Sequence, residues 1–65
     1  MTEEDNRSLL RRLNRAGGQL NAIRKMVEVS ECVDALLIQI SAVKAALTQT
    51  ALELMEKHLV HCAQI

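Results

Sequence analysis

The sequence contains no phenylalanine, tryptophan, tyrosine or proline, and its only two glycines, Gly17 and Gly18, are adjacent. Because turns rich in glycine and proline usually separate the strands of a sheet, this composition argues against a β-sheet protein. A chain without aromatic side chains also lacks the means to stack on unpaired bases, which argues against single-strand and RNA-loop binding. The remaining class is a helical protein.

Long apolar runs are absent as well. No stretch of about 18 apolar residues occurs, so we expect no transmembrane segment. Residues 1–5 are acidic and carry no apolar signal segment, which predicts a cytoplasmic protein. In that compartment two cysteines are more typical of metal ligands or redox sensors than of a structural disulfide. No catalytic triad or phosphate-binding loop is visible, so we do not expect an enzyme.

The charges are balanced overall but unevenly placed. Residues 1–5 hold three acids, residues 26–65 hold five acids and two bases, and residues 6–25 hold six bases and no acid. A strongly basic segment predicts a surface for a polyanionic partner, although a solvated helix face gives the same pattern. The six bases are Arg7, Arg11, Arg12, Arg15, Arg24 and Lys25.

Two stretches of the single domain 1–65 have the apolar spacing of long helices. Residues 2–28 begin with a capping-box pattern and residues 31–62 follow Ser30, the expected N-cap. Gly17 and Gly18 interrupt the first stretch, which predicts a bend or the close approach of another backbone. In each stretch the positions expected to face a neighbouring helix recur at alternating steps of four and three, and we call this row of positions the seam. The seam of the first stretch is Leu9, Leu13, Ala16, Leu20, Ile23 and Val27, and that of the second is Leu36, Ile40, Val43, Leu47, Thr50 and Leu54.

These seams predict an all-α fold of two long antiparallel helices that associates with further copies. A 65-residue hairpin leaves one side of each seam uncovered, and so short a chain has a marginal core of its own. We therefore expect at least a dimeric four-helix bundle, and a dimer of dimers above it. The alternative is a monomeric antiparallel hairpin.

Three residues suggest a metal site. His58 and Cys62 stand four residues apart and share a helix face, whereas Cys32 lies 26 residues before His58. That separation is roughly 39 Å along a helix, so no single chain brings the three together. Two antiparallel copies of the second helix would, because the start of each then lies beside the end of the other. His61 would point away from this face.

Two thiolates and one imidazole form a soft ligand set that suits Cu(I) best, with Zn(II) possible if a fourth ligand is supplied. Two other interpretations stay open. The cysteines of two chains could react with a persulfide or an oxidant to form a sulfur link. Alternatively, a lone Cys or His is commonly an ordinary packing residue, and the chain would then be a helical module without a ligand.

Four segments resemble the copper-sensing operon repressor (CsoR/RcnR) family. They cover nearly the whole chain from residue 7 to residue 62 and comprise residues 12–20 (RLNRAGGQL), 32–34 (CVD), 39–47 (QISAVKAAL) and 52–62 (LELMEKHLVHC). The resemblance implies a helical homotetramer that represses transcription by binding operator DNA and releases the DNA when its site is occupied. It implies Cu(I) ligands at Cys32, His58 and Cys62, and a DNA-binding motif at Arg12 and Arg15 with Arg11, Arg24 and Lys25 alongside.

The chain departs from relatives that sense other species. Nickel and cobalt sensors have a histidine near the N-terminus, formaldehyde sensors have proline after the first methionine, and persulfide sensors lack the histidine at position 58. It also departs from the copper sensors. Gln49 and Glu31 stand where those proteins often have Arg and Tyr, and Cys32 falls one residue before the ligand position, which is Val33 here. Copper sensors usually continue into a third helix beyond the position of Ile65.

Overall fold

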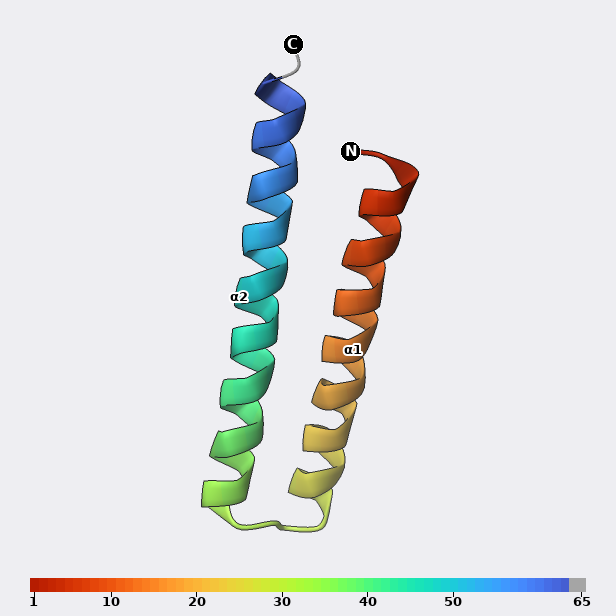
Figure 1. Cartoon of the computed structure of the whole chain (residues 1–65). Helices are drawn as coiled ribbons and strands as arrows, with labels where there is room; N and C mark the ends of the chain where they lie inside the picture. The colour runs from red at the N-terminus through yellow and green to blue at the C-terminus, as the bar shows by residue number, and fades with distance from the viewer. Residues whose placement is uncertain (64–65) are drawn as a thin grey trace.

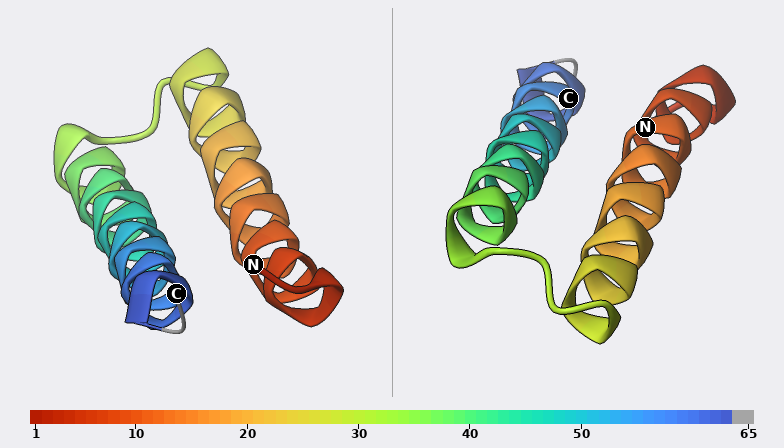
Figure 2. Two further views of the ribbon diagram at one scale, coloured as in Figure 1. Left: turned by 90° about the horizontal axis from the view of Figure 1, so that it is seen from above. Right: turned by 90° about the horizontal axis from the view of Figure 1, so that it is seen from below.

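Two helices pack side by side as an antiparallel hairpin (Figures 1 and 2). The computed structural model describes the backbone of residues 1–63 and the side chains of residues 1–59. Helix α1 runs over Glu3–Glu28 and helix α2 over Val33–Ala63, and the chain measures 52 × 18 × 9 Å. The described part contains no strand, so the prediction of an all-α fold of two long helices is confirmed.

The start of α1 is fixed by the predicted capping box. The Asp5 backbone N–H donates to the Thr2 Oγ1 at 3.1 Å, and the Thr2 backbone N–H donates to the Asp5 carboxylate at 3.0 Å. These two bonds satisfy donors that the first helical turn leaves without partners. Helix α1 then continues through Gly17 and Gly18 without interruption, and nothing lies within 4 Å of where their side chains would be. The close approach of another backbone, one of the two expectations for this position, is therefore absent from the single hairpin.

The expectation that Ser30 caps the second helix is wrong. Ser30 has a φ of 57° and ends the first helix, because its N–H donates to the Val27 carbonyl and the Glu31 N–H donates to the Met26 carbonyl. This pair of bonds is a Schellman motif, in which a left-handed residue satisfies the last carbonyls of a helix. The second helix consequently starts at Val33 instead of residue 31, and Cys32 accepts its first backbone bond, from Leu36.

The core lies along one edge of each seam. Leu9, Ala16 and Ile23 of α1 are buried, as are Val43 and Thr50 of α2, so the buried positions recur every seven residues. Thr50 satisfies its hydroxyl by donating to the Ala46 carbonyl at 2.9 Å. The intervening seam positions remain exposed, namely Leu13, Leu20, Val27, Ile40, Leu47 and Leu54. One hairpin therefore covers half of its apolar seam, and the dimer and tetramer stay predictions.

Helix α2 is apolar enough to resemble a membrane span by length and composition. Within Val33–Leu59 an 18-residue window reaches a mean hydropathy of 1.4, and 11% of that window is buried in the hairpin. The sequence-based exclusion of a membrane span is therefore not supported by composition alone. The core helix of a multi-subunit bundle has the same composition, because it is covered on more than one side.

Candidate metal centre and nucleic-acid interface

Cys32 lies in the connection between the helices, directly before α2. Its thiol is free and exposed. The resemblance noted in the sequence places the expected ligand position at Val33, one residue after Cys32, and on a helix such a shift turns a side chain by about 100°. Because α2 begins only at Val33, Cys32 is not held to that helical direction.

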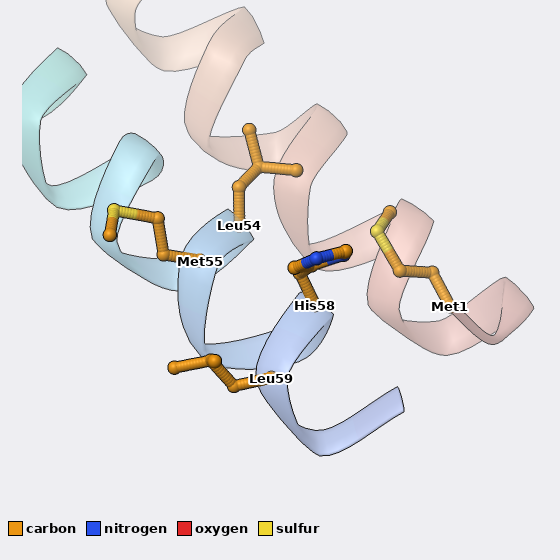
Figure 3. Close-up of a pocket in the computed structure, with 5 residues that line it drawn as sticks. All are labelled: Met1, Leu54, Met55, His58 and Leu59. Atoms are coloured by element: carbon orange, nitrogen blue, oxygen red, sulfur yellow. The ribbon is translucent and has the colours of Figure 1, made fainter. Parts of the chain in front are cut away.

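His58 lies at the opposite end of α2, beside the start of the chain. It is exposed and lines an apolar hollow of about 390 Å³ together with Met1, Leu54, Met55 and Leu59 (Figure 3). Helix α2 remains helical through Ala63, so the backbones of positions 58 and 62 are one turn apart. The side chains of His61 and Cys62 lie outside the described residues.

The three expected metal ligands do not meet within one chain. Cys32 and His58 are separated by 25 intervening positions of an unbroken helix, roughly 39 Å along its axis. Among side chains 1–59 no group of three His, Cys, Asp or Glu residues lies close enough to hold a metal ion. A site that uses both ends of α2 therefore needs a second chain.

An ion pair fixes the start of α1 next to His58. The Lys57 Nζ lies 3.0 Å from the Asp5 carboxylate. The backbone N–H of Thr2, and after it the Lys57 ammonium, lower the pKa of Asp5 from 3.8 to about 2, because both stabilise the ionised carboxylate. The same contact raises the pKa of Lys57. The capping box and this ion pair together hold residues 1–5 over the end of α2 that carries His58.

Three of the five predicted DNA-binding residues gather on α1. Arg11, Arg12 and Arg15 line a shallow hollow of about 240 Å³ with Ser8, and all three arginines are exposed. Arg24 and Lys25 are exposed as well, but they lie nine or more residues farther along, about 14 Å from Arg15 at the helical rise. The structure therefore provides one arginine cluster and a separate basic pair near the connection.

Sequence reasoning missed a contact that ties this cluster to α2. The Glu53 carboxylate accepts a hydrogen bond from the Ser8 hydroxyl at 3.1 Å and from the Arg12 Nε at 3.3 Å. The sequence does contain a signal for this contact. The two helices run antiparallel on either side of residues 29–32, so positions equally far from that connection face each other. Finding the facing positions requires knowing where α1 ends and α2 begins. The assignment of Ser30 as an N-cap placed the start of α2 too early.

Comparison with known proteins points to one family. The family described as metal-sensitive transcriptional repressor matches residues 5–64. The chain is 52% identical over 52 residues to the copper-sensing transcriptional repressor CsoR of Bacillus subtilis (strain 168), a match that covers 78% of this chain and 50% of the relative. No solved structure matches the chain.

A second relative gives a similar result. The copper-sensing transcriptional repressor RicR of Mycobacterium tuberculosis (strain H37Rv) is 47% identical over 53 residues, which are 80% of this chain and 54% of the relative. The chain thus spans about half the length of the curated relatives it matches.

Proposed function

Because the chain belongs to the family of metal-sensitive transcriptional repressors, we propose that it binds operator DNA in the cytoplasm and releases it on binding Cu(I). The resemblance inferred from the sequence motifs is confirmed by the family match. The relatives are repressors and not enzymes, in agreement with the expectation that this chain is no enzyme.

We infer a metal site shared between two chains, with Cys32 from one and His58 and Cys62 from the other. The observation that carries this inference is the position of Cys32 and His58 at opposite ends of one continuous helix. Two antiparallel copies of α2 place each Cys32 near the other chain's positions 58 and 62. The ligand types fit Cu(I), which favours thiolate and imidazole donors in low coordination numbers. Zn(II) would need a fourth ligand.

The half-covered seam supports the assembly that such a site requires. Leu13 and Leu20 of α1, and Ile40 and Leu47 of α2, are about half exposed in the single hairpin. Packing these side chains against a second copy completes a four-helix bundle, and a dimer of dimers covers more of α2.

DNA binding in this proposal uses Arg11, Arg12 and Arg15, with Arg24 and Lys25 farther along α1. Guanidinium groups on an exposed helix face pair with phosphates and release counterions, so affinity should fall steeply with salt. Ligation by Cys32 and His58 fixes the start of one α2 against the end of the other. A bundle fixed in this way has a different packing from an unlinked one, and the two α1 helices then no longer match the spacing of DNA phosphates.

Anaerobic titration tests the proposal. We expect one Cu(I) bound tightly per subunit, with a matching loss of DNA affinity in fluorescence anisotropy. His58→Ala should weaken Cu(I) binding and abolish the release of DNA, while leaving the DNA affinity of the metal-free protein unchanged. Undiminished release of DNA by Cu(I) in His58→Ala would contradict the assigned site.

The exposed thiol of Cys32 favours one second candidate, a repressor that senses persulfides or oxidants through Cys32 and Cys62. In that case His58→Ala would change nothing, and an added persulfide or oxidant would link two chains through their cysteines. Non-reducing electrophoresis after such treatment distinguishes the candidates, since a Cu(I) sensor releases DNA without forming a covalent dimer.

A further inference from the structure

Glu53 is a largely buried carboxylate between the helices, and nothing in the proposed metal chemistry uses it. Its side chain is 16% exposed. One oxygen, Oε1, accepts from both Ser8 and Arg12, which stand four residues apart on the same face of α1. The other oxygen, Oε2, is buried and has no hydrogen-bond partner among the described residues. Arg12 is therefore the cation that Glu53 holds by a hydrogen bond, and Lys57, one turn farther along α2, adds a longer-range attraction.

While Arg12 donates to Glu53, part of its guanidinium remains available to bind an anion. The contact with Glu53 uses the Nε–H, one of five donors on a guanidinium, and the side chain remains 47% exposed. Arg12 also borders the hollow formed with Ser8, Arg11 and Arg15. An anion in that hollow can meet the terminal nitrogens of Arg12 without displacing Glu53.

We propose that Glu53 is a positioning residue for DNA binding, holding the Arg12 guanidinium in the orientation in which it meets a phosphate. This inference rests on the proposed function, because it requires that Arg12 contacts DNA. A guanidinium already fixed by a carboxylate loses less rotational freedom when it binds, and the affinity gained is roughly three- to tenfold.

The opposite role, in which Glu53 competes with DNA for Arg12, is disfavoured by the burial of its carboxylate. If Arg12 moved from Glu53 to a phosphate, the Ser8 hydroxyl would be the one remaining hydrogen-bond donor to this carboxylate among the described residues. Because the Glu53 side chain is only 16% exposed, water replaces the lost contact poorly, and leaving the carboxylate without Arg12 is unfavourable. The phosphate therefore adds to the contact and does not replace it.

Glu53 also links the sensing helix to the DNA-binding helix. It lies on α2 five residues before His58, whereas both groups that it accepts from lie on α1. A shift of α2 along α1 would carry the carboxylate with it and turn the Arg12 guanidinium.

A double-mutant cycle on the full chain tests this role. The probe is a fluorescent duplex selected from a random-sequence pool by the wild-type protein, and the readout is its dissociation constant with metal-free protein. Glu53→Ala should weaken binding roughly three- to tenfold, whereas Glu53→Gln, which keeps an accepting oxygen, should restore most of the affinity. In an Arg12→Ala background Glu53→Ala should have no further effect. Glu56→Ala, an exposed acid on the same helix, is the matched control and should not weaken binding.

The outcomes separate this inference from the proposed function. Tighter DNA binding by Glu53→Ala would overturn the positioning role in favour of competition. An equal loss in both backgrounds would also overturn it, because Glu53 would then act only on stability. If Arg12→Ala weakens binding and Glu53→Ala does not, the inference fails and the proposed function stands. If Arg12→Ala itself leaves binding unchanged, the DNA contact assigned to Arg12 in the proposed function is wrong, and this inference fails with it.

Discussion

At the scale of single residues, Ser30 shows how a local backbone requirement decides where a helix starts. A left-handed residue ends α1 most cheaply when it is glycine, because a side chain with a Cβ is strained at a φ of 57°. Serine meets the requirement at an energetic cost, and the turn that it forms leaves Cys32 outside α2.

Ser30→Gly should therefore stabilise the protein. Glycine relieves the backbone strain of the folded state, which stabilises the protein, but it also makes the unfolded chain more flexible, which destabilises it. We expect the first effect to be larger, with a net gain of about 0.5–1 kcal/mol in the free energy of unfolding. Urea denaturation followed by circular dichroism measures it. Ser30→Ala keeps the Cβ and serves as the control that should show no gain, and an equal gain from both variants would contradict the strain argument.

Asp5 makes a second prediction at this scale, in the pH dependence of stability. Its pKa is lowered in the folded protein to about 2 from 3.8, so the contact stabilises the fold above pH 3.8 and is lost as the pH falls towards 2. Asp5→Asn should be less stable than wild type at neutral pH, and the difference should shrink as the pH falls below 3.8 and disappear below pH 2. Unfolding curves at a series of pH values measure the difference, and a gap that persists unchanged at pH 2 would show that the carboxylate charge is not its source.

At the scale of elements, the sequence predicted most of the fold and a smaller part of the candidate site. The seam spacing and the capping box of Thr2 and Asp5 predicted both helices because they are local patterns. Ser30 was misassigned because serine suits an N-cap as well as a turn. The contact between Arg12 and Glu53 depends on how the helices pair, which local patterns do not contain.

Gly17 and Gly18 lie in the middle of α1 with open space around them. Gly17→Ala should therefore stabilise the helix by about 1 kcal/mol, because alanine has the higher helix propensity. Thermal unfolding measures the gain, and Gly18→Ala is the parallel variant. If either alanine destabilises the protein while the chain is assembled, a neighbouring molecule must approach α1 at that position, and the open space of the single hairpin does not describe the assembled protein.

The salt dependence of DNA binding belongs to α1 as a whole. Arg15→Ala should lower the slope of log affinity against log salt by about 0.9 for the one phosphate contact it removes. Arg7, which pairs with Glu3 and Glu4 at the start of the helix, gives the matched control. Titrations of a labelled duplex at several salt concentrations measure the slope for each variant. Equal slopes for wild type and Arg15→Ala would show that Arg15 does not contact the DNA.

At the scale of the whole molecule, a single hairpin buries only part of its apolar seam and leaves the rest exposed. Leu47 is 48% exposed in the single chain although it lies on the predicted seam of α2. If a second copy buries it, Leu47→Gln should weaken assembly by about 1.5–3 kcal/mol, since that is the free energy of burying a leucine. Analytical ultracentrifugation measures the change. Thr48→Gln, at the exposed neighbouring position, should leave assembly unchanged, and an equally small effect of both variants would contradict a subunit boundary at Leu47.

Exchange of subunits between variants tests most directly the claim that two chains share the metal site. Cys32→Ala and Cys62→Ala should each lose tight Cu(I) binding alone. When the two are unfolded and refolded together, a mixed dimer regains one complete site, so random mixing should restore about a quarter of the wild-type sites. A mixture of His58→Ala with Cys62→Ala should restore none, because those two ligands come from the same chain. Failure of the first mixture to regain binding would contradict the account.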